Sequence, residues 1–269
     1  NRFNLEIFQT QTIHEGVDLA SKAVDQHYDV ILAAGGDGTV NQVVNGIIKG
    51  RESNNDLPTL GIIPIGTGND LARGLGLKAD VKQLLTLLNR FEPNKIDVGK
   101  VDFTTENGAP GYQYFVNVAD IGMGPEVVKR VMTSNRILGS ALDYYTSILS
   151  TFISYKPIIA YAKTQDWEWS GKLRTLAIAN GNYYGHGLCI APEASVTDGI
   201  FETFICGNAS VSDFVLQSRN LKRRKKIAHD EVTYLRASEY YLTAESKCGI
   251  EADGEFLGWL PAQVSLIPH

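Results

Sequence analysis

Two glycine-rich turns and one late acidic turn contain the residues in this sequence best suited to chemistry. The first turn reads GGDGT over residues 35–39, and the second reads GTGND over residues 66–70. Glycines lack a Cβ, so the backbone can approach a phosphate closely, and the first N–H groups of a following helix point at the anion. Neither turn is a G-x-x-x-x-G-K-[ST] or G-x-G-x-x-G loop, and a structural turn explains either one alone. The pair together favours a phosphate site.

The late acidic turn reads Asp-Gly-Glu over residues 253–255. An Asp-Gly pair is also typical of a tight β-hairpin, and the sequence leaves both interpretations open. Phosphoryl transfer needs a group that accepts the proton of the attacking hydroxyl, and it needs magnesium to neutralise phosphate charge. Acidic residues that converge from distant parts of the chain would meet both needs.

The elements around the glycine turns predict how they are positioned. Residues 29–34 read DVILAA, the composition of a buried parallel strand, and apolar residues recur at helical spacing over 40–50. The same order returns with a strand over 59–65 and a helix from residue 71. A strand over 5–9 and a helix over 17–24 are expected upstream. Because open parallel sheets bind ligands at the carboxyl ends of their strands, we expect the two turns to clasp one nucleotide.

Beyond residue 95 the sequence predicts mostly strands. They cover residues 95–101, 112–118, 158–163, 173–179, 201–206, 239–243, 248–252 and 263–267, with helices over 125–132, 141–153 and 211–219. A run of strands after an α/β segment indicates a separate β-rich domain. We expect domains at residues 1–94 and 95–269 that share a cleft, with the last residues returning to the first domain.

The composition is that of a globular protein and narrows the class of partner. Of the 269 residues, 43% are hydrophobic and 20% are charged, which excludes a disordered or collagen-like chain. A net charge of −5 disfavours a nucleic-acid partner. No apolar run reaches the roughly 18 residues that a membrane-spanning helix needs. The three cysteines form no C-x-x-C pair, so we expect buried thiols in a reducing compartment.

Six segments, spread over nearly the whole chain, carry a resemblance to a known family. They are GGDGTVNQVVNG at 35–46, GTGNDLAR at 66–73, KIDVG at 95–99, ANGNYYGHG at 179–187, APEASVTDG at 191–199 and EADGE at 251–255. In this order they resemble the diacylglycerol kinase catalytic family, in particular its bacterial lipid kinases, which are related to sphingosine kinases. GGDGT alone is shared with NAD kinases, whereas GTGND and its spacing to the late DGE are more specific to lipid kinases.

The resemblance implies an N-terminal parallel α/β nucleotide-binding domain, like that of NAD kinases and diacylglycerol kinases, and a C-terminal β-sandwich domain. It implies ATP and magnesium as cofactors. The residues that match the family's ATP site are Gly35, Gly36, Asp37, Gly38, Thr39, Val40 and Asn41, with Gly66, Thr67, Gly68 and Asn69 of the second turn.

The resemblance also implies roles for acidic residues. Glu255 matches the family's proton acceptor, with Asp253 as its neighbour and Asp37 close to the phosphates. Asp37, Asp70 and Asp97 match acidic positions that organise magnesium and water. A second, structural magnesium would match Asp198 with the backbone carbonyls of Ser195 and Ile200, although this loop, SVTDGI, departs from the more usual SLNDG pattern.

The function expected from these residues is an ATP-dependent lipid kinase that phosphorylates diacylglycerol or a related lipid alcohol. One alternative is an NAD kinase-like kinase of a soluble substrate. Another is a non-catalytic nucleotide-binding module, because the Asn-Pro-x-Ser-Gly loop that opens family members is absent here or reduced to Asn1. The sequence leaves the oligomeric state open, with a homodimer among the alternatives.

Two further segments bear on where such an enzyme works. Residues 222–226 read KRRKK, which is either a solvated helix end or a contact with anionic lipid headgroups. An apolar stripe at helical spacing is either core or the lining of a lipid entrance; it consists of Tyr144, Tyr145, Ile148, Leu149, Phe152 and Ile153. We expect a cytoplasmic protein that contacts the inner membrane surface transiently.

Overall fold

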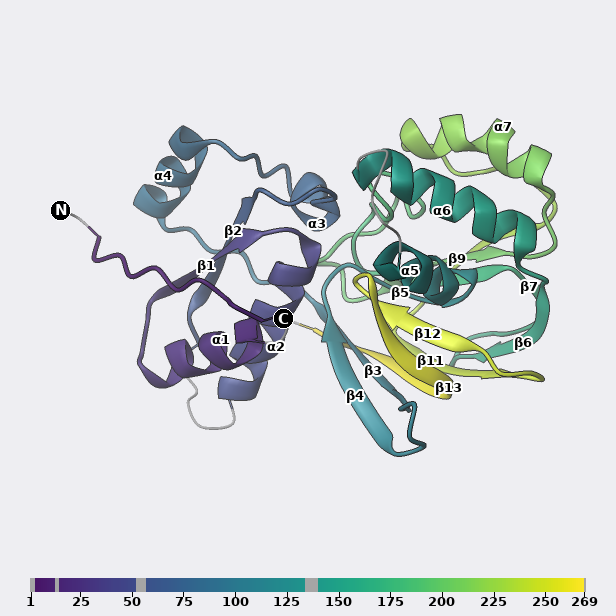
Figure 1. Ribbon diagram of the computed structural model, residues 1–269, viewed down its shortest axis with the longest axis horizontal. Helices are drawn as coiled ribbons and strands as arrows, with labels where there is room; N and C mark the ends of the chain where they lie inside the picture. The colour runs from purple at the N-terminus through teal and green to yellow at the C-terminus, as the bar shows by residue number, and fades with distance from the viewer. Residues whose placement is uncertain (1–2, 13–14, 52–56, 134–139, 269) are drawn as a thin grey trace.

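The computed structural model describes residues 3–12, 15–51, 57–133 and 140–268, and Asn1 lies outside them. Its amino-terminal unit contains two parallel strands, β1 (Val30–Gly35) and β2 (Thr59–Pro64), which pair directly along their whole length. The helices of this unit are α1 (Glu15–Asp25), α2 (Asp37–Gly50), α3 (Asp70–Gly74) and α4 (Val81–Arg90) (Figure 1). The apolar faces of β1 and α2 pack with α1 around Val24, Ala33 and Val44. The predicted order of strand, glycine turn and helix is therefore confirmed twice.

The strand predicted over residues 5–9 is wrong. Residues 3–12 form no regular element, and the side chains of Leu5 and Ile7 are exposed. A strand needs a neighbouring strand to pair its backbone N–H and C=O groups, and β1 and β2 form a sheet of two strands in the part of the chain that the structure describes.

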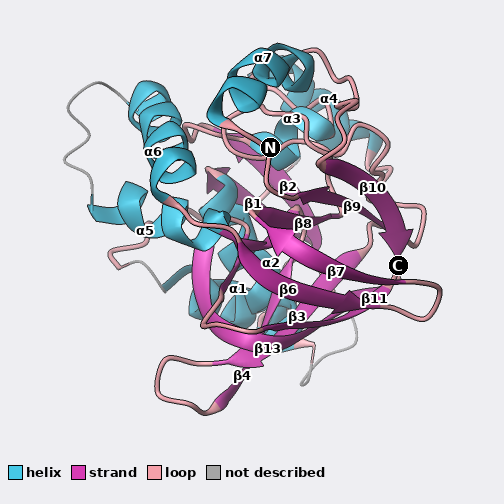
Figure 2. Cartoon of the chain, turned by 90° about the vertical axis from the view of Figure 1, so that its right-hand side faces the viewer, coloured by secondary structure: helices cyan, strands magenta, loops and turns pink. Residues whose placement is uncertain are grey.

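The carboxyl-terminal unit is built on one antiparallel sheet of eleven strands that curls around its own core. The strands are β3 (Val98–Thr104), β4 (Pro110–Phe115), β5 (Val118–Gly122), β6 (Ile158–Lys163), β7 (Glu168–Leu173), β8 (Thr175–Ala179), β9 (Phe201–Cys206), β10 (Val232–Ala237), β11 (Glu239–Ala244), β12 (Gly249–Ala252) and β13 (Glu255–Ile267). The order along the sheet is β10-β9-β8-β5-β12-β13-β11-β6-β7, and β3 joins β13 to β4. Figure 2 shows these strands from the side of this unit.

Three helices cover part of one face of this sheet: α5 (Met123–Thr133), α6 (Ser140–Ser154) and α7 (Val211–Lys222) (Figures 1 and 2). They pack on an apolar layer that includes Val118, Ile148 and Phe204. The expected architecture, an α/β unit followed by a β-sandwich unit, is confirmed. None of the helices in the described residues has the length and hydropathy of a bilayer-spanning segment.

The long strand β13 links the parts of the second unit. It pairs with β12 near its start and with β11 and β3 further on, and it ends with Ile267 opposite Val98. Val98 also packs against the core of the first unit, so the end of β13 lies close to the junction between the units. Cys189, Cys206 and Cys248 are buried free thiols, as expected.

Candidate active site

The two glycine turns meet at the ends of β1 and β2. The backbone N–H groups of Ile65 and Gly66 both donate to the carbonyl oxygen of Gly35, at 3.2 Å each. A Cβ on Gly66 would overlap the Cα of Gly36, so side chains are excluded from this contact. The expectation that the two turns lie together is therefore confirmed.

The start of α2 is open to a ligand. Its N-cap residue is Gly36, which has no side chain to cap the helix, and the first N–H groups of a helix need acceptors from outside the helix. A Cβ on Gly38 would meet no atom within 4 Å, so packing does not require a glycine here. The backbone at Gly38 instead faces open space, which suits the close approach of a phosphate. Thr39 lies against Gly35, and Val40 is buried in the core of the first unit.

Asp37 and Asn69 shape the second turn rather than leaving their side chains free. The Oδ1 of Asp37 accepts a hydrogen bond from the N–H of Leu71 at 3.2 Å, at the start of α3. A Cβ on Gly68 would lie 2.7 Å from the Oδ2 of Asp37, so this glycine makes room for that carboxylate. The side chain of Asn69, whose φ is 54°, accepts from the N–H of Gly66 at 3.1 Å and donates to its carbonyl at 2.7 Å. Thr67 is exposed at the tip of the turn.

Asp70 joins the second turn to the second unit. Its carboxylate accepts hydrogen bonds from the backbone N–H groups of His186, at 2.9 Å, and Gly187, at 2.7 Å. Burial, followed by the charge of nearby Asp37, raises the pKa of Asp70 to about 6. Magnesium prefers oxygen ligands, and a divalent cation would relieve this repulsion between two carboxylates. The donor set at Asp37 and Asp70 therefore fits magnesium.

The late acidic turn is a two-residue hairpin between β12 and β13, so the hairpin interpretation is confirmed. Asp253 and Gly254 have φ angles of 49° and 84°. The carboxylate of Asp253 accepts from the side-chain amide of Asn41 at 2.9 Å. It also accepts from three backbone N–H groups, those of Val116, Asn117 and Val118, at 2.9–3.1 Å. Asp253 thus anchors the hairpin to α2.

This anchor sets the position of Glu255 relative to the glycine turns. Asn41 lies four residues after Asp37, about one helical turn along α2. Glu255 is the first residue of β13 and pairs with Ala252 across the hairpin that Asp253 holds. The structure therefore brings the hairpin of Glu255 and the start of α2 to the same junction between the two units.

Asp97 lies against the loop that carries Asp198. Its Oδ2 accepts from the N–H of Gly199 at 2.9 Å, and its own N–H donates to the carbonyl of Val196 at 2.7 Å. Ser195 and Ile200 belong to the same loop, and Asp198 is exposed. Over residues 3–268, outside the short gaps, no three His, Cys, Asp or Glu side chains group as metal ligands. A magnesium ion in this loop would therefore depend on carbonyl oxygens and water.

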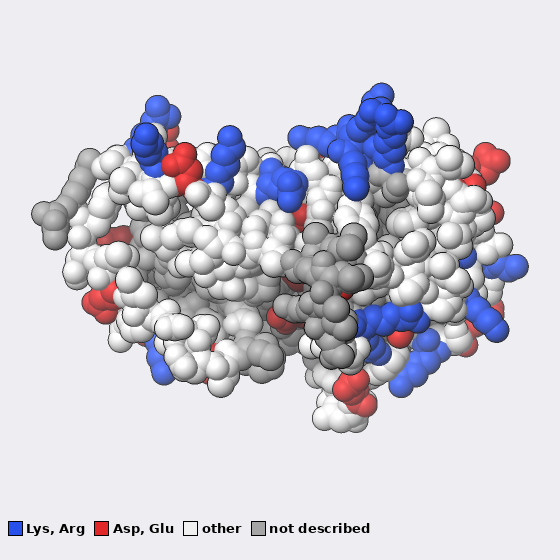
Figure 3. Space-filling model, turned by 45° about the horizontal axis from the view of Figure 1, so that its top comes forward, with Lys and Arg blue, Asp and Glu red and all other residues white. Residues whose placement is uncertain are grey.

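Basic and apolar side chains share the outer surface near α7. Residues 222–226 are all exposed, at and just beyond the end of this helix. On α7 itself, Val215 and Leu216 are 54% and 73% exposed. Figure 3 shows Lys and Arg gathered along the upper edge of the molecule. The solvated helix end expected from KRRKK is thus accompanied by exposed apolar residues.

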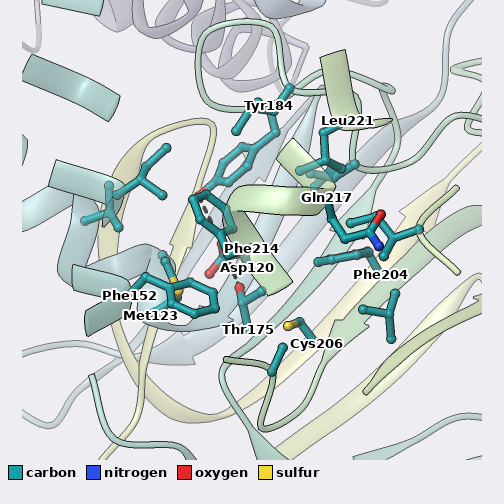
Figure 4. A pocket seen from close by; sticks show the side chains of 18 of the residues that line it. Asp120, Met123, Phe152, Thr175, Tyr184, Phe204, Cys206, Phe214, Gln217 and Leu221 are labelled. Atoms are coloured by element: carbon teal, nitrogen blue, oxygen red, sulfur yellow. Dashed lines mark hydrogen bonds between the residues drawn. The ribbon is translucent and has the colours of Figure 1, made fainter. Parts of the chain in front are cut away.

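An apolar pocket lies beneath α5, α6 and α7 (Figure 4). Its cavity volume is about 100 Å³, and it opens to solvent. From the apolar stripe, Tyr144, Ile148 and Phe152 line the pocket, whereas Leu149 and Ile153 are exposed. The stripe therefore contributes its inner face to the lining of a cavity.

The pocket contains a polar group that the sequence interpretation missed. The hydroxyl of Tyr184 lies 2.9 Å from the Oδ2 of Asp120 and 2.8 Å from the Oε1 of Glu251. Both carboxyl groups are almost completely buried. Burial raises the pKa of Asp120 to about 7 and the pKa of Glu251 well above its usual value. In the sequence, Tyr184 and Glu251 stand out only because they lie in two of the segments that resemble the kinase family, ANGNYYGHG and EADGE.

The polar group is connected to the late acidic turn. The Oε2 of Glu251 accepts a hydrogen bond from the N–H of Gly254 at 2.9 Å. Tyr144, at the pocket lining, packs against His186 with ring centroids 4.4 Å apart and ring planes tilted by 35°, and the backbone N–H of His186 donates to Asp70. The polar end of the pocket therefore adjoins the junction that carries the glycine turns and Glu255.

Comparisons with known proteins agree with this arrangement. A family model described as the diacylglycerol kinase catalytic domain matches residues 1–101, and one described as the YegS C-terminal NAD kinase beta sandwich-like domain matches residues 117–269. Diacylglycerol kinase of Bacillus subtilis (strain 168) is 31% identical over 253 residues, 93% of this chain and 79% of the relative. "Probable lipid kinase YegS-like" of Stenotrophomonas maltophilia (strain K279a) is 28% identical over 93% of this chain and 80% of the relative.

A solved structure shows the same fold. The crystal structure of a diacylglycerol kinase from Bacillus anthracis str. Sterne aligns with a TM-score of 0.69 at 20% sequence identity. The alignment covers 98% of this chain and 82% of that chain. The likeness therefore extends over both units.

Proposed function

Because this chain belongs to the diacylglycerol kinase catalytic family, we propose that it is an ATP-dependent lipid kinase that phosphorylates diacylglycerol or a related lipid alcohol. The observation that carries the proposal is the meeting of the two glycine turns beside a hairpin that ends in Glu255. Asp253 holds this hairpin on α2, the helix that the first glycine turn opens.

In the proposed reaction ATP binds with its phosphates against the glycine turns. The open backbone at Gly38 and the uncapped start of α2 supply room and N–H donors for the phosphates. Gly35, Gly36 and Gly66 bring the two turns into contact, and Thr39 and Thr67 offer hydroxyl groups at their edges. Magnesium held by Asp37 and Asp70 would neutralise phosphate charge.

Glu255 acts as the proton acceptor. The hydroxyl oxygen of the lipid attacks the γ-phosphorus, its proton passes to the carboxylate of Glu255, and ADP leaves. The bond from the γ-phosphorus to ADP breaks as the bond to the lipid oxygen forms. Asp253 is a positioning residue in this scheme, since its two carboxylate oxygens accept four hydrogen bonds from groups of the protein.

The lipid's chains enter the apolar pocket beneath α5–α7. Its walls include Phe152, Phe204 and Leu221, and its polar end adjoins the junction. Val215, Leu216 and the basic residues 222–225 lie on the outer surface of the same helix and its end, whereas Lys226 is ion-paired with Glu193 and Glu202. This surface suits transient contact with an anionic membrane, where apolar side chains insert and basic side chains attract headgroups.

The test is a reaction with a mixture of acceptors. The purified protein is incubated with ATP, magnesium, a total lipid extract and NAD, and the products are identified by mass spectrometry. We expect new lipid phosphomonoesters and unchanged NAD. Phosphorylated NAD without new lipid products would favour the soluble-substrate alternative, and ATP binding without any product would favour a non-catalytic module.

A further inference from the structure

The buried pair Asp120 and Glu251 is the feature of the second unit that packing does not explain. Carboxyl groups are costly in an apolar cavity, and a neutral side chain of the same size would cost less. Asp120 lines the pocket, and a Cβ on Gly124 would overlap its carboxylate. The chain therefore has a glycine where α5 begins, and this glycine leaves room for a carboxyl group in an apolar wall.

The hydrogen bonds at this pair leave one oxygen of Asp120 without a partner in the part of the chain that the structure describes. Tyr184 has one hydroxyl proton, yet its oxygen lies within hydrogen-bond distance of both Asp120 and Glu251. One carboxyl group must then carry a proton and donate it, while the other accepts. Thr175 adds a weak donor to Asp120 at 3.4 Å. The Oδ1 of Asp120 is buried and has no hydrogen-bond partner among the described residues.

We propose that Asp120 and Tyr184, with Glu251 behind them, bind a second hydrogen-bond donor of the lipid, next to the hydroxyl that reacts. This inference rests on the proposed lipid kinase function and refines its substrate. The donor is a second hydroxyl or an amine, so the preferred acceptor is a monoacylglycerol or a long-chain amino alcohol rather than diacylglycerol.

The chemistry of the pair excludes other headgroups. Diacylglycerol has one hydroxyl, and its ester oxygens only accept hydrogen bonds, so it offers nothing to the free Oδ1 of Asp120 once its hydroxyl reacts. A phosphodiester headgroup such as that of phosphatidylglycerol has hydroxyl donors, but its charge repels a pair that carries a carboxylate. A neutral diol or an ammonium group satisfies the pair in both respects.

The position of the pair fits this role. Glu251 accepts from the N–H of Gly254, the residue before the proposed proton acceptor Glu255. A headgroup bound at Asp120 and Tyr184 therefore has its neighbouring hydroxyl at the side of the pocket that adjoins the hairpin. Its chain extends toward Phe214 and Leu221, which line the pocket below α7 (Figure 4).

The experiment measures lipid binding separately from transfer. The full chain, loaded with a non-hydrolysable ATP analogue and magnesium, is titrated with detergent micelles containing one lipid. The four lipids are 1-monooleoylglycerol, a long-chain 2-amino-1,3-diol, dioleoylglycerol and phosphatidylglycerol. Phosphorylation of each lipid with ATP is measured in parallel.

We expect the monoacylglycerol or the amino alcohol to bind about 10-fold more tightly than the other two lipids, because one hydrogen bond to a charged group accounts for such a difference. The better of the two identifies the donor as hydroxyl or amine. Asp120→Asn should remove most of this preference while ATP-analogue affinity stays unchanged. Tyr184→Phe is the second variant and should act in the same direction, and Asp166→Asn, in the exposed turn before β7, is the matched control.

The results distinguish a failure of the inferred headgroup preference from a failure of the proposed lipid kinase function. If dioleoylglycerol or phosphatidylglycerol binds as well as the other two lipids, or if folded Asp120→Asn and Tyr184→Phe keep the parent's preference, the inference is wrong while lipid kinase activity stands. If no lipid of any kind is bound or phosphorylated, the proposed function itself is wrong.

Discussion

The junction of the glycine turns and the apolar pocket both bury carboxyl groups, but they satisfy them differently. At the junction, Asp37, Asp70 and Asp253 accept hydrogen bonds from backbone N–H groups. In the pocket, Asp120 and Glu251 share the hydroxyl of Tyr184 and have raised pKa values. Burial raises carboxyl pKa values in both regions, and hydrogen bonds from donors oppose it: the pKa of Asp70, whose donors are two backbone N–H groups, rises to about 6, whereas that of Asp120, whose partners are two hydroxyl groups, rises to about 7. The proposed function assigns the phosphates to the first region and the lipid headgroup to the second.

The largest expected effect tests whether the chemistry belongs to the junction. Glu255→Gln removes the proposed proton acceptor, so turnover should fall by about 100-fold or more while the affinity for ATP stays the same. Steady-state rates of phosphoryl transfer and calorimetric titration with ATP provide the two values. Glu239→Gln, an exposed position on β11, is the matched control. Turnover close to that of the control would remove Glu255 from the mechanism.

The next effect concerns the anchor between hairpin and helix. Asp253→Asn keeps the shape of the side chain but replaces one carboxylate oxygen with an NH₂ group. Because this NH₂ group faces two N–H donors and cannot accept from them, two hydrogen bonds are lost. We expect the free energy of unfolding to fall by about 2–3 kcal/mol, measured by urea denaturation. Turnover should fall as well, because the position of Glu255 depends on this hairpin. A variant as stable and as active as the parent would show that Asp253 is no anchor.

The smallest effect distinguishes the pocket from the junction by its pH dependence. Asp120 has a pKa of about 7 in the folded chain against 3.8 as its ordinary value, so folding opposes its ionisation. The folded state therefore loses stability as the pH rises from about 4 through 7, and Asp120→Asn avoids this loss. We expect the variant to gain stability relative to the parent as the pH rises from about 4 to about 8, and to match the parent near pH 4. Thermal unfolding of both proteins across this range gives the difference, and a constant difference would contradict the assignment.

The two regions also differ in how far the sequence predicts them. Each glycine turn directly follows a short apolar strand. Because the carboxyl ends of parallel strands lie at the same edge of a sheet, the sequence alone could predict that the two turns meet. The carboxyl pair could not, because Asp120 and Glu251 are 131 positions apart and become neighbours only where β5 pairs with β12. Nothing in the local pattern around either residue signals a buried carboxyl group.

The strands of the second unit also differ in how well the sequence predicts them. The interior strands β9 and β12 are buried along their whole length, and the sequence predicts both, although each contains a buried glutamate, Glu202 or Glu251. The strands β7 and β10 were missed, since they lie at the two ends of the sheet, where polar residues such as Glu168 and Arg236 face solvent. Residues 5–9 show the converse error, because an apolar pattern alone does not supply a pairing partner. The single strand predicted over residues 112–118 is wrong as well, because β4 ends at Phe115 and the buried strand β5 begins at Val118.

The central claim is that the two glycine turns bind the phosphates of ATP, and Gly38→Ala tests it most directly. A Cβ at this position meets no atom of the protein, so the melting temperature should be unchanged or slightly raised, since alanine favours a helix. The same Cβ fills the space where the phosphates would lie, so calorimetric titration should show ATP affinity at least about 10-fold weaker. A variant that binds ATP as tightly as the parent would contradict the account.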